Sequence, residues 1–225
     1  MKRDIDINEI SDGRRYGLND MVKADCGDCA GCWDCCSGMG SSIVLDPLDL
    51  HRLQDGTGLS AEQLLDQYLE LGVVDGLILP HLKLAGEGER CGFLTAEGRC
   101  GIHSFRPGIC RLFPLGRLYE EGKVFYFLQV NECSHKNRGK IKVRKWLEEA
   151  DAAGYEGFIR EWHYFLLDVE EAIAQRGEDA FHRQITAYLL RLFYLTPYRQ
   201  EDFFGQLYQR LSEAREFWQL PEQLR

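Results

Sequence analysis

The sequence predicts an α+β fold, in which small irregular β structure with a cysteine-rich metal-binding core is followed by a helical C-terminal half. Three observations predict it. All nine cysteines of the 225-residue chain lie between Cys26 and Cys133. Short apolar runs separated by glycine-containing turns, a pattern typical of strands, occur in the same part of the chain. From Trp146 onwards, apolar residues recur at helical spacing and cysteine is absent.

These patterns divide the chain into three segments. Residues 1–25 are polar with little periodicity, and we expect an N-terminal arm there. Residues 26–140 hold every cysteine and are expected to form a metal-binding domain. Residues 141–225 are expected to form a helical extension packed on that domain. A chain of this length can bury a core of its own.

Two helix starts follow the first cysteines. The Asp-Pro dipeptide at 46–47 predicts a helix that ends near Gly56, because Asp accepts from unpaired N–H groups and Pro fits the first turn. Ser60 and Gln63 have the spacing of a capping box. They predict a second helix that continues to about Leu71.

Strands are expected on both sides of these helices and between the later cysteines. The predicted segments are a short strand at 42–45, strand-like residues at 73–84, a hairpin from Cys91 to Cys100, and a hairpin formed by 116–119 and 124–130. In the C-terminal half, three or four helices are expected, and the last spans about Glu201 to Trp218.

The overall charge narrows the functional classes. The chain has 27 basic and 36 acidic residues, a net charge of -9. This charge argues against a general nucleic-acid binder, which needs a basic surface to neutralise phosphates. No apolar run reaches the roughly 18 residues that span a bilayer, and the N-terminus is charged where a signal peptide is apolar. We expect a cytoplasmic protein without a membrane partner; an unknown protein partner stays open.

The cysteines are the most informative residues. Cys26, Cys29, Cys32 and Cys35 form three overlapping C-x-x-C pairs, and Cys36 follows directly. A C-x-x-C pair presents two thiolates to one ion, because a tight turn brings its sulfurs together. Cytosolic chains rarely hold structural disulfides. A lone cysteine is usually a buried apolar residue, but this clustering favours metal or cluster ligation.

A second group contains Cys91, Cys100, Cys110 and Cys133. With the first group it resembles a known family, the CxxCxxCC (YkgJ-like) cysteine-cluster family, whose domain is described as zinc- or iron-chelating. The matching stretches are Cys29-Ala-Gly-Cys32-Trp-Asp-Cys35-Cys36, Cys91-Gly-Phe-Leu, Cys100-Gly-Ile-His, Arg106-Pro107, Cys110-Arg-Leu-Phe-Pro114 and Cys133.

The resemblance implies eight metal-ligating cysteines: Cys29, Cys32, Cys35, Cys36, Cys91, Cys100, Cys110 and Cys133. Cys26 is an additional cysteine and, with His103, a further candidate ligand. Arg106 and Arg111 lie inside the motif and are candidates to donate to sulfur or offset thiolate charge from outside the ligand set. His103 stands three residues after Cys100, which is ligand spacing, although a surface histidine is the commoner case.

The metal stays open between an iron–sulfur cluster, of the 4Fe–4S type, and zinc. Adjacent Cys35 and Cys36 and the scarcity of histidine favour a cluster. Separated cysteine pairs are more commonly zinc ligands. The role of the metal is structural or redox. The alternative function is an S-adenosylmethionine-dependent protein lysine N-methylase, because flagellin methylases resemble this family in the cysteine motif. A metal chaperone is a third hypothesis.

Overall fold

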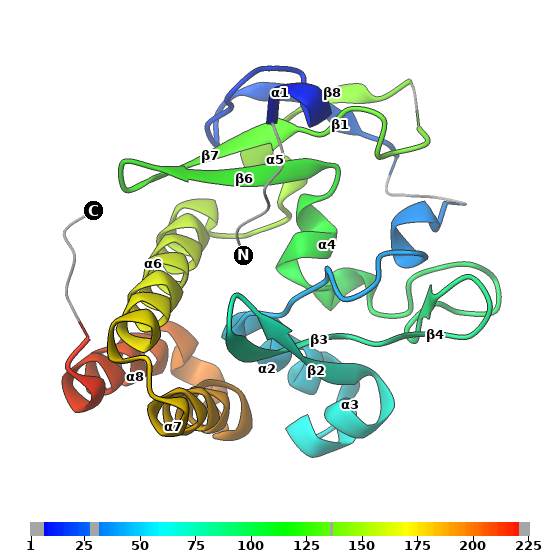
Figure 1. The fold of residues 1–225 in the computed structure, drawn as a ribbon. Helices are drawn as coiled ribbons and strands as arrows, with labels where there is room; N and C mark the ends of the chain where they lie inside the picture. Colours follow the sequence, from blue (N-terminus) through cyan, green and yellow to red (C-terminus); the bar gives the residue numbers. More distant parts are fainter. Residues whose placement is uncertain (1–6, 28–31, 136, 221–225) are drawn as a thin grey trace.

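The computed structural model describes residues 7–27, 32–135 and 137–220. The longer helices are α2 (Pro47–Thr57), α3 (Ala61–Gln67), α6 (Ala152–Arg176), α7 (Asp179–Leu190) and α8 (Phe203–Trp218), and the short ones are α1 (Ile7–Ile10), α4 (Gly108–Leu112) and α5 (Val143–Trp146) (Figure 1). Short helical turns of other types are η1 (Asp34–Cys36), η2 (His103–Phe105), η3 (Arg191–Leu195) and η4 (Gln200–Asp202).

The strands of the described residues form four separate two-stranded antiparallel sheets. They pair β1 (Met21–Asp25) with β8 (Gly139–Lys142), β2 (Leu69–Val74) with β3 (Leu77–Leu82), β4 (Leu84–Ala85) with β5 (Arg90–Cys91), and β6 (Leu115–Glu120) with β7 (Lys123–Leu128). Small sheets followed by a helical half confirm the predicted α+β class.

Both predicted helix starts are confirmed. Asp46 accepts from the Asp49 N–H while the Asp49 side chain accepts from the Asp46 N–H, which caps α2. Ser60 and Gln63 form the same reciprocal pair at α3. The predicted end at Leu71 was wrong: α3 stops at Gln67 because the next residues enter β2, where Leu69 pairs with Leu82 of β3.

Two predicted strands take other forms. The segment 42–45 makes only an isolated bridge from Val44 to His81, although Leu45 N–H and Leu82 N–H give it two further backbone hydrogen bonds to β3. The strand-like residues 73–84 form most of the β2–β3 hairpin, which turns at Asp75 and Gly76. The hairpin around residues 116–130 is confirmed as β6–β7.

Residues 7–25 are more regular than the sequence predicts. Tyr16 exchanges two backbone hydrogen bonds with Tyr126 of β7, at 2.8 and 2.9 Å. β1 then pairs with β8, with Asp25 opposite Gly139. The polar composition hides this pairing because only Val22 and Ala24 of β1 are buried. Figure 1 shows β1, β8, β6 and β7 together at one end of the molecule.

Helices α6, α7 and α8 form a second layer beside α2 and the β2–β3 hairpin (Figure 1). Phe158, Phe165 and Phe193 are fully buried in a core that is continuous with Leu50 and Leu53 of α2. Asp168 on α6, 1% exposed, forms an ion pair of 2.6 Å with Arg215 on α8. This pair joins the first and last helices of the layer.

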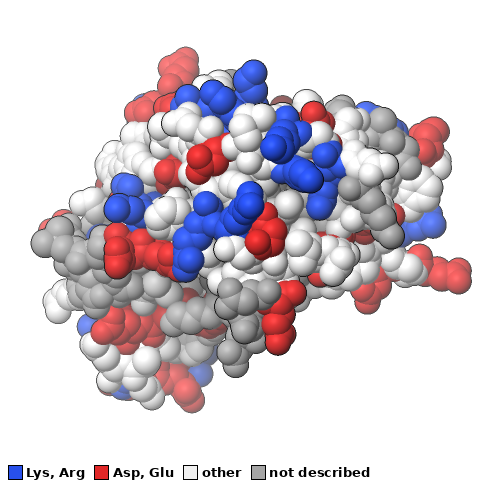
Figure 2. Space-filling model, turned by 90° about the horizontal axis from the view of Figure 1, so that it is seen from above, with Lys and Arg blue, Asp and Glu red and all other residues white. Residues whose placement is uncertain are grey.

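No helix in the part of the chain that the structure describes is long and apolar enough to cross a membrane. Seen from the β1–β8 end, Lys and Arg side chains gather across the surface despite the acidic composition (Figure 2). Exposed Lys23, Lys140 and Lys142 belong to that sheet.

Candidate metal centre

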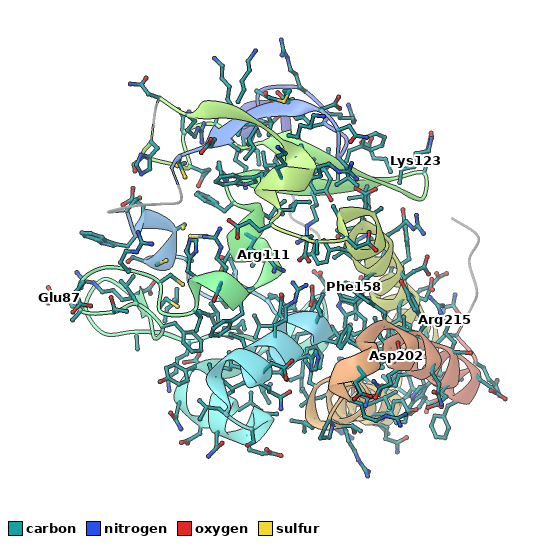
Figure 3. The ribbon with its side chains drawn as sticks, turned by 180° about the vertical axis from the view of Figure 1, so that it is seen from behind. Glu87, Arg111, Lys123, Phe158, Asp202 and Arg215 are labelled. Carbon is teal, nitrogen blue, oxygen red and sulfur yellow. The ribbon has the colours of Figure 1, made fainter. Side chains whose placement is uncertain are left out.

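Cysteines from three segments of the chain line one small cavity, which we call the thiol pocket. Its volume is about 50 Å³, larger than the roughly 10–15 Å³ that one water needs. The lining cysteines are Cys32, Cys35, Cys36, Cys91, Cys100 and Cys110. Figure 3 shows yellow sulfur atoms close together between η1 and α4. The structure therefore brings together six of the predicted ligands.

Backbone pairing places the first two segments. The η1 turn is closed by a 2.8 Å hydrogen bond from Cys36 N–H to Trp33 O. Directly after it, Ser37 bridges Arg90 of β5, and Gly38 N–H donates to Glu89 O. Since Cys36 and Cys91 are the neighbours of this bridged pair, the bridge brings their two segments together.

The Cys91–Cys100 segment turns back on itself as predicted, in a short and irregular hairpin. Leu94 and Cys100 form an isolated antiparallel bridge, Thr95 N–H donates to Arg99 O at 2.8 Å, and Gly101 N–H donates to Phe93 O at 2.8 Å. Gly98 has φ +73°, and a Cβ there would lie 2.7 Å from the Trp33 ring. Only glycine fits this conformation and this contact, so Trp33 packs over the loop and holds the Cys32–Cys36 stretch against it.

Helix α4 presents Cys110 to the thiol pocket. Its first residue, Gly108, donates its N–H to Asp49 Oδ1 at 2.7 Å. Its last carbonyl, of Leu112, accepts from Trp146 Nε1 at 3.1 Å. A short helix is marginal by itself, so these two contacts fix its position.

The remaining cysteines lie elsewhere. Cys133 and Cys26 do not line the thiol pocket, and Cys29 falls outside the described residues. Cys32 Sγ lies 3.8 Å from Ser134 Oγ, beside Cys133. Cys26 directly follows β1, whose Asp25 pairs with Gly139, so the Cys26 and Cys133 segments reach the same end of the β1–β8 sheet.

The eight cysteines that the structure describes are free thiols. No three Cys, His, Asp or Glu side chains among the described residues converge as they would on one metal ion. The thiols therefore fit a soft metal by donor type and by a shared pocket, while their sulfur atoms would have to move closer together to coordinate it.

A family model matches residues 28–141, slightly more than half of the chain, and is described as a "putative zinc- or iron-chelating domain". The chain belongs to the CxxCxxCC family. No curated protein and no solved structure matches the chain. The match begins after Cys26 and ends after Cys133, so the CxxCxxCC domain includes all the cysteines that the resemblance assigned as ligands.

Burial favours the protonated form of three thiols of the CxxCxxCC domain. Desolvation raises the pKa of Cys91 and of Cys100, and raises that of Cys110 well above its ordinary value. Cys35 differs, because a hydrogen bond with Cys36 lowers the pKa of Cys35 to about 7 and raises the pKa of Cys36. A metal must be bound by thiolates, so binding at the thiol pocket would release protons.

Of the two arginines predicted to offset thiolate charge, Arg106 is the one that lies at the thiol pocket. It lines the thiol pocket and is 7% exposed. The hydrogen bond with Cys36 lowers the pKa of Cys35 most, and the positive charge of Arg106 lowers it further. Arg106 Nη2 donates to Glu148 at 3.0 Å. Arg111 does not line the thiol pocket; it forms a 2.8 Å ion pair with Glu149, and Figure 3 shows it on the inner side of α4.

His103 also lines the thiol pocket, but its Nε2 lies 2.6 Å from Arg106 Nη1. A guanidinium only donates hydrogen bonds, so this nitrogen accepts one and is not directed at a metal.

Sequence reasoning missed a second, larger cavity of about 500 Å³ next to the CxxCxxCC thiols. Cys35 and Cys110 line both cavities. Asp46 and Arg117 line the larger one, although the sequence indicated Asp46 only as a helix cap. The only signal in the sequence was the pair of carboxylates at 46 and 49. Such a pair also forms the capping box of an ordinary helix start, so it does not indicate a cavity.

Proposed function

We propose that the chain is a metal-binding protein whose cysteine thiolates hold an iron–sulfur cluster in the thiol pocket. The observation that carries the proposal is that six free cysteines, from residues 32 to 110, line one pocket. Family membership supports the coarser statement that the metal is zinc or iron.

The number of thiols favours a cluster over a single zinc ion. Structural zinc takes four ligands, whereas six cysteines line the thiol pocket. Cys35 and Cys36 are adjacent in the chain and approach each other closely enough to share a hydrogen bond. Two neighbouring thiolates are more easily placed on different iron atoms of a polynuclear centre than on one ion. His103 faces Arg106, which leaves a sulfur-only ligand set.

Arg106 supports the same proposal through charge. Each cysteine that becomes a thiolate adds a negative charge to a buried site, and burial of unpaired charge is costly. Arg106 is the buried cation on the pocket wall. We propose that it offsets thiolate charge without binding the metal, as groups outside the ligand set do.

The test is metal and acid-labile sulfide content with an absorption spectrum, on protein purified without oxygen. Iron with sulfide and a broad absorption band in the visible is the expected result. Cys110→Ser should lose it, while Cys26→Ser, outside the thiol pocket and outside the matched residues, should keep it. If the protein contains zinc and no sulfide, the site is a zinc site and the cluster proposal is wrong. A folded protein with neither metal would refute metal binding.

The lysine N-methylase remains the alternative function. It requires the chain to bind S-adenosylmethionine, which calorimetry with the pure protein measures directly. A saturable heat of binding would favour this alternative. The absence of heat at millimolar S-adenosylmethionine would exclude it.

A further inference from the structure

The larger cavity has the size and lining of a small-molecule site. Its volume of about 500 Å³ falls within the range of roughly 300–1,000 Å³ that ligand pockets occupy. The walls come from the segment before α2, from the β2–β3 hairpin, from β6 and from α6. Most lining residues are apolar, with aromatic side chains at Phe113, Tyr119, Phe127 and Trp162.

Arg117 of β6 brings a positive charge to this cavity. Its Nη2 donates to the Tyr155 hydroxyl at 3.3 Å, and its Nε is buried without a hydrogen-bond partner. Among the described residues, no carboxylate lies within ion-pair distance of its guanidinium. By contrast, nearby Arg111 is paired with Glu149. Arg117 therefore has donors to offer to an anionic group in the cavity.

Asp46 brings a negative charge to the same cavity. Its Oδ1 accepts the Asp49 N–H at 2.9 Å as the helix cap. Both oxygens of Asp49 are used, by Gly108 N–H and Asp46 N–H. Asp46 Oδ2 has no hydrogen bond within the described part of the chain. Burial and the neighbouring Asp49 raise the pKa of Asp46 to about 7, while the charges of Arg117 and Arg111 act in the opposite direction.

The remaining charged residues restrict the ligand further. Asp75, Glu132 and Glu170 also line the cavity. These carboxylates disfavour a purely anionic ligand. A purely cationic ligand would leave the Arg117 guanidinium buried and unpaired, which is costly. A ligand that carries both charges avoids both costs.

We propose that this cavity binds a free amino acid with an apolar side chain, whose carboxylate pairs with Arg117, whose ammonium group pairs with Asp46, and whose side chain packs on the aromatic wall. A guanidinium binds a carboxylate through two parallel hydrogen bonds, which fixes its orientation. Because Cys35 and Cys110 line both cavities, the ligand lies beside the thiol pocket. The inference goes beyond metal binding and does not depend on which metal is present.

The experiment is isothermal titration calorimetry of the full chain, purified without oxygen, with each of the twenty free amino acids. At least one apolar amino acid should bind at sub-millimolar concentration. The amine and the acid that lack its carboxylate or its ammonium group should each bind roughly tenfold more weakly or worse, as the loss of a charged hydrogen bond predicts. Absence of binding by all twenty at millimolar concentration would overturn the proposal.

Three variants separate the parts of the site. Arg117→Lys keeps the positive charge but not the two parallel hydrogen-bond donors, and should weaken binding of the amino acid roughly tenfold. Asp46→Asn can still cap α2, and should weaken the amino acid but not its deaminated acid. Glu120→Gln, an exposed residue of the same strand, is the control and should change nothing. Wild-type affinity for the amino acid in Asp46→Asn or in Arg117→Lys would contradict the assignment.

Metal content, measured on every sample, keeps the two proposals distinct. Arg117→Lys should bind metal normally while binding the amino acid more weakly. A wild-type protein that binds an amino acid but contains no metal would refute the metal centre alone, and the opposite result would refute the cavity alone.

Discussion

Arg106 Nη1 lies 2.6 Å from His103 Nε2, on the wall of the thiol pocket. The two residues are three apart in the chain, and η2 (His103–Phe105) brings them together. The histidine nitrogen accepts from the guanidinium, and Glu148 accepts from the other side of it. The pair therefore holds a cation, rather than a histidine ligand, next to the sulfurs.

His103→Ala should accordingly leave the metal content per chain unchanged. Cys100→Ser, three residues earlier, should lower it, because it removes a thiol of the pocket. Elemental analysis of both variants, purified side by side, gives the comparison. A loss of metal in His103→Ala equal to that in Cys100→Ser would make the histidine a ligand.

Arg106→Gln should weaken metal binding most at low pH. The Arg106 charge, after the hydrogen bond with Cys36, helps to keep the pKa of Cys35 low. Without it more protons compete with the metal, and each unit of pKa corresponds to about tenfold in apparent affinity below that pKa. Competitive zinc titrations from pH 6 to about pH 9 should show the variant and the wild type converging as pH rises. A constant ratio across this range would show that Arg106 does not act through thiol ionisation.

The metal-free protein should lose stability in alkali. In the folded state the pKa values of Cys91, Cys100 and Cys110 are raised by burial. A raised folded pKa stabilises the protein below the unfolded value, about 8.5 for cysteine, and this contribution is lost as pH rises through the folded pKa. Urea unfolding under reducing conditions should show the free energy of unfolding falling above pH 8.5. Cys110→Ala should flatten this fall, whereas metal-loaded protein, whose thiolates are already ionised, should not show it.

Gly108→Ala should destabilise the fold. The added Cβ would overlap the Tyr155 hydroxyl oxygen, at the residue whose N–H is bound by Asp49. Overpacking of this kind costs about 1–3 kcal/mol. The control is Gly157→Ala in α6, where a Cβ meets nothing within 4 Å; it should stabilise the protein by about 0.5–1 kcal/mol. Thermal unfolding should move the two variants in opposite directions, and equal shifts would contradict the packing argument.

Asp168→Ala should be far more damaging than Glu120→Ala. Asp168 is buried and pairs with Arg215, so its removal leaves a partly buried cation and costs about 3–5 kcal/mol. Glu120 pairs with Arg15 at nearly the same distance, 2.7 Å, but both side chains are exposed. An exposed pair contributes about 0–1 kcal/mol. Urea denaturation distinguishes the two, and a similar loss in both would mean that burial does not decide the effect.

Local signals predicted most of the fold. Capping residues located α2 and α3, a glycine turn located the β6–β7 hairpin, and helical spacing located α6 and α8. Errors occurred where long-range pairing decides the outcome. Leu69 to Leu71 continue the helical pattern of the sequence, yet they form β2 and pair with β3. Residues 21–25, predicted as part of an arm, form β1 and pair with a strand that begins at Gly139.

The candidate site was predictable in part for the same reason. Cysteine spacing and family resemblance named the residues, and six of them line one pocket. The separation of Cys133 from that pocket, and the engagement of His103 by Arg106, depend on tertiary contacts that spacing does not encode. The division of the chain at residues 25 and 140, and the ligand role of each cysteine, stay predictions.

The pairing of Asp25 with Gly139 means that the cysteine-bearing stretch begins and finishes at the same place. The stretch is therefore a long loop whose two ends already lie beside each other. The entropy of closing so long a loop grows only slowly with its length. The residues on either side of this stretch therefore lie side by side, and its interior shares one continuous core with the C-terminal helices.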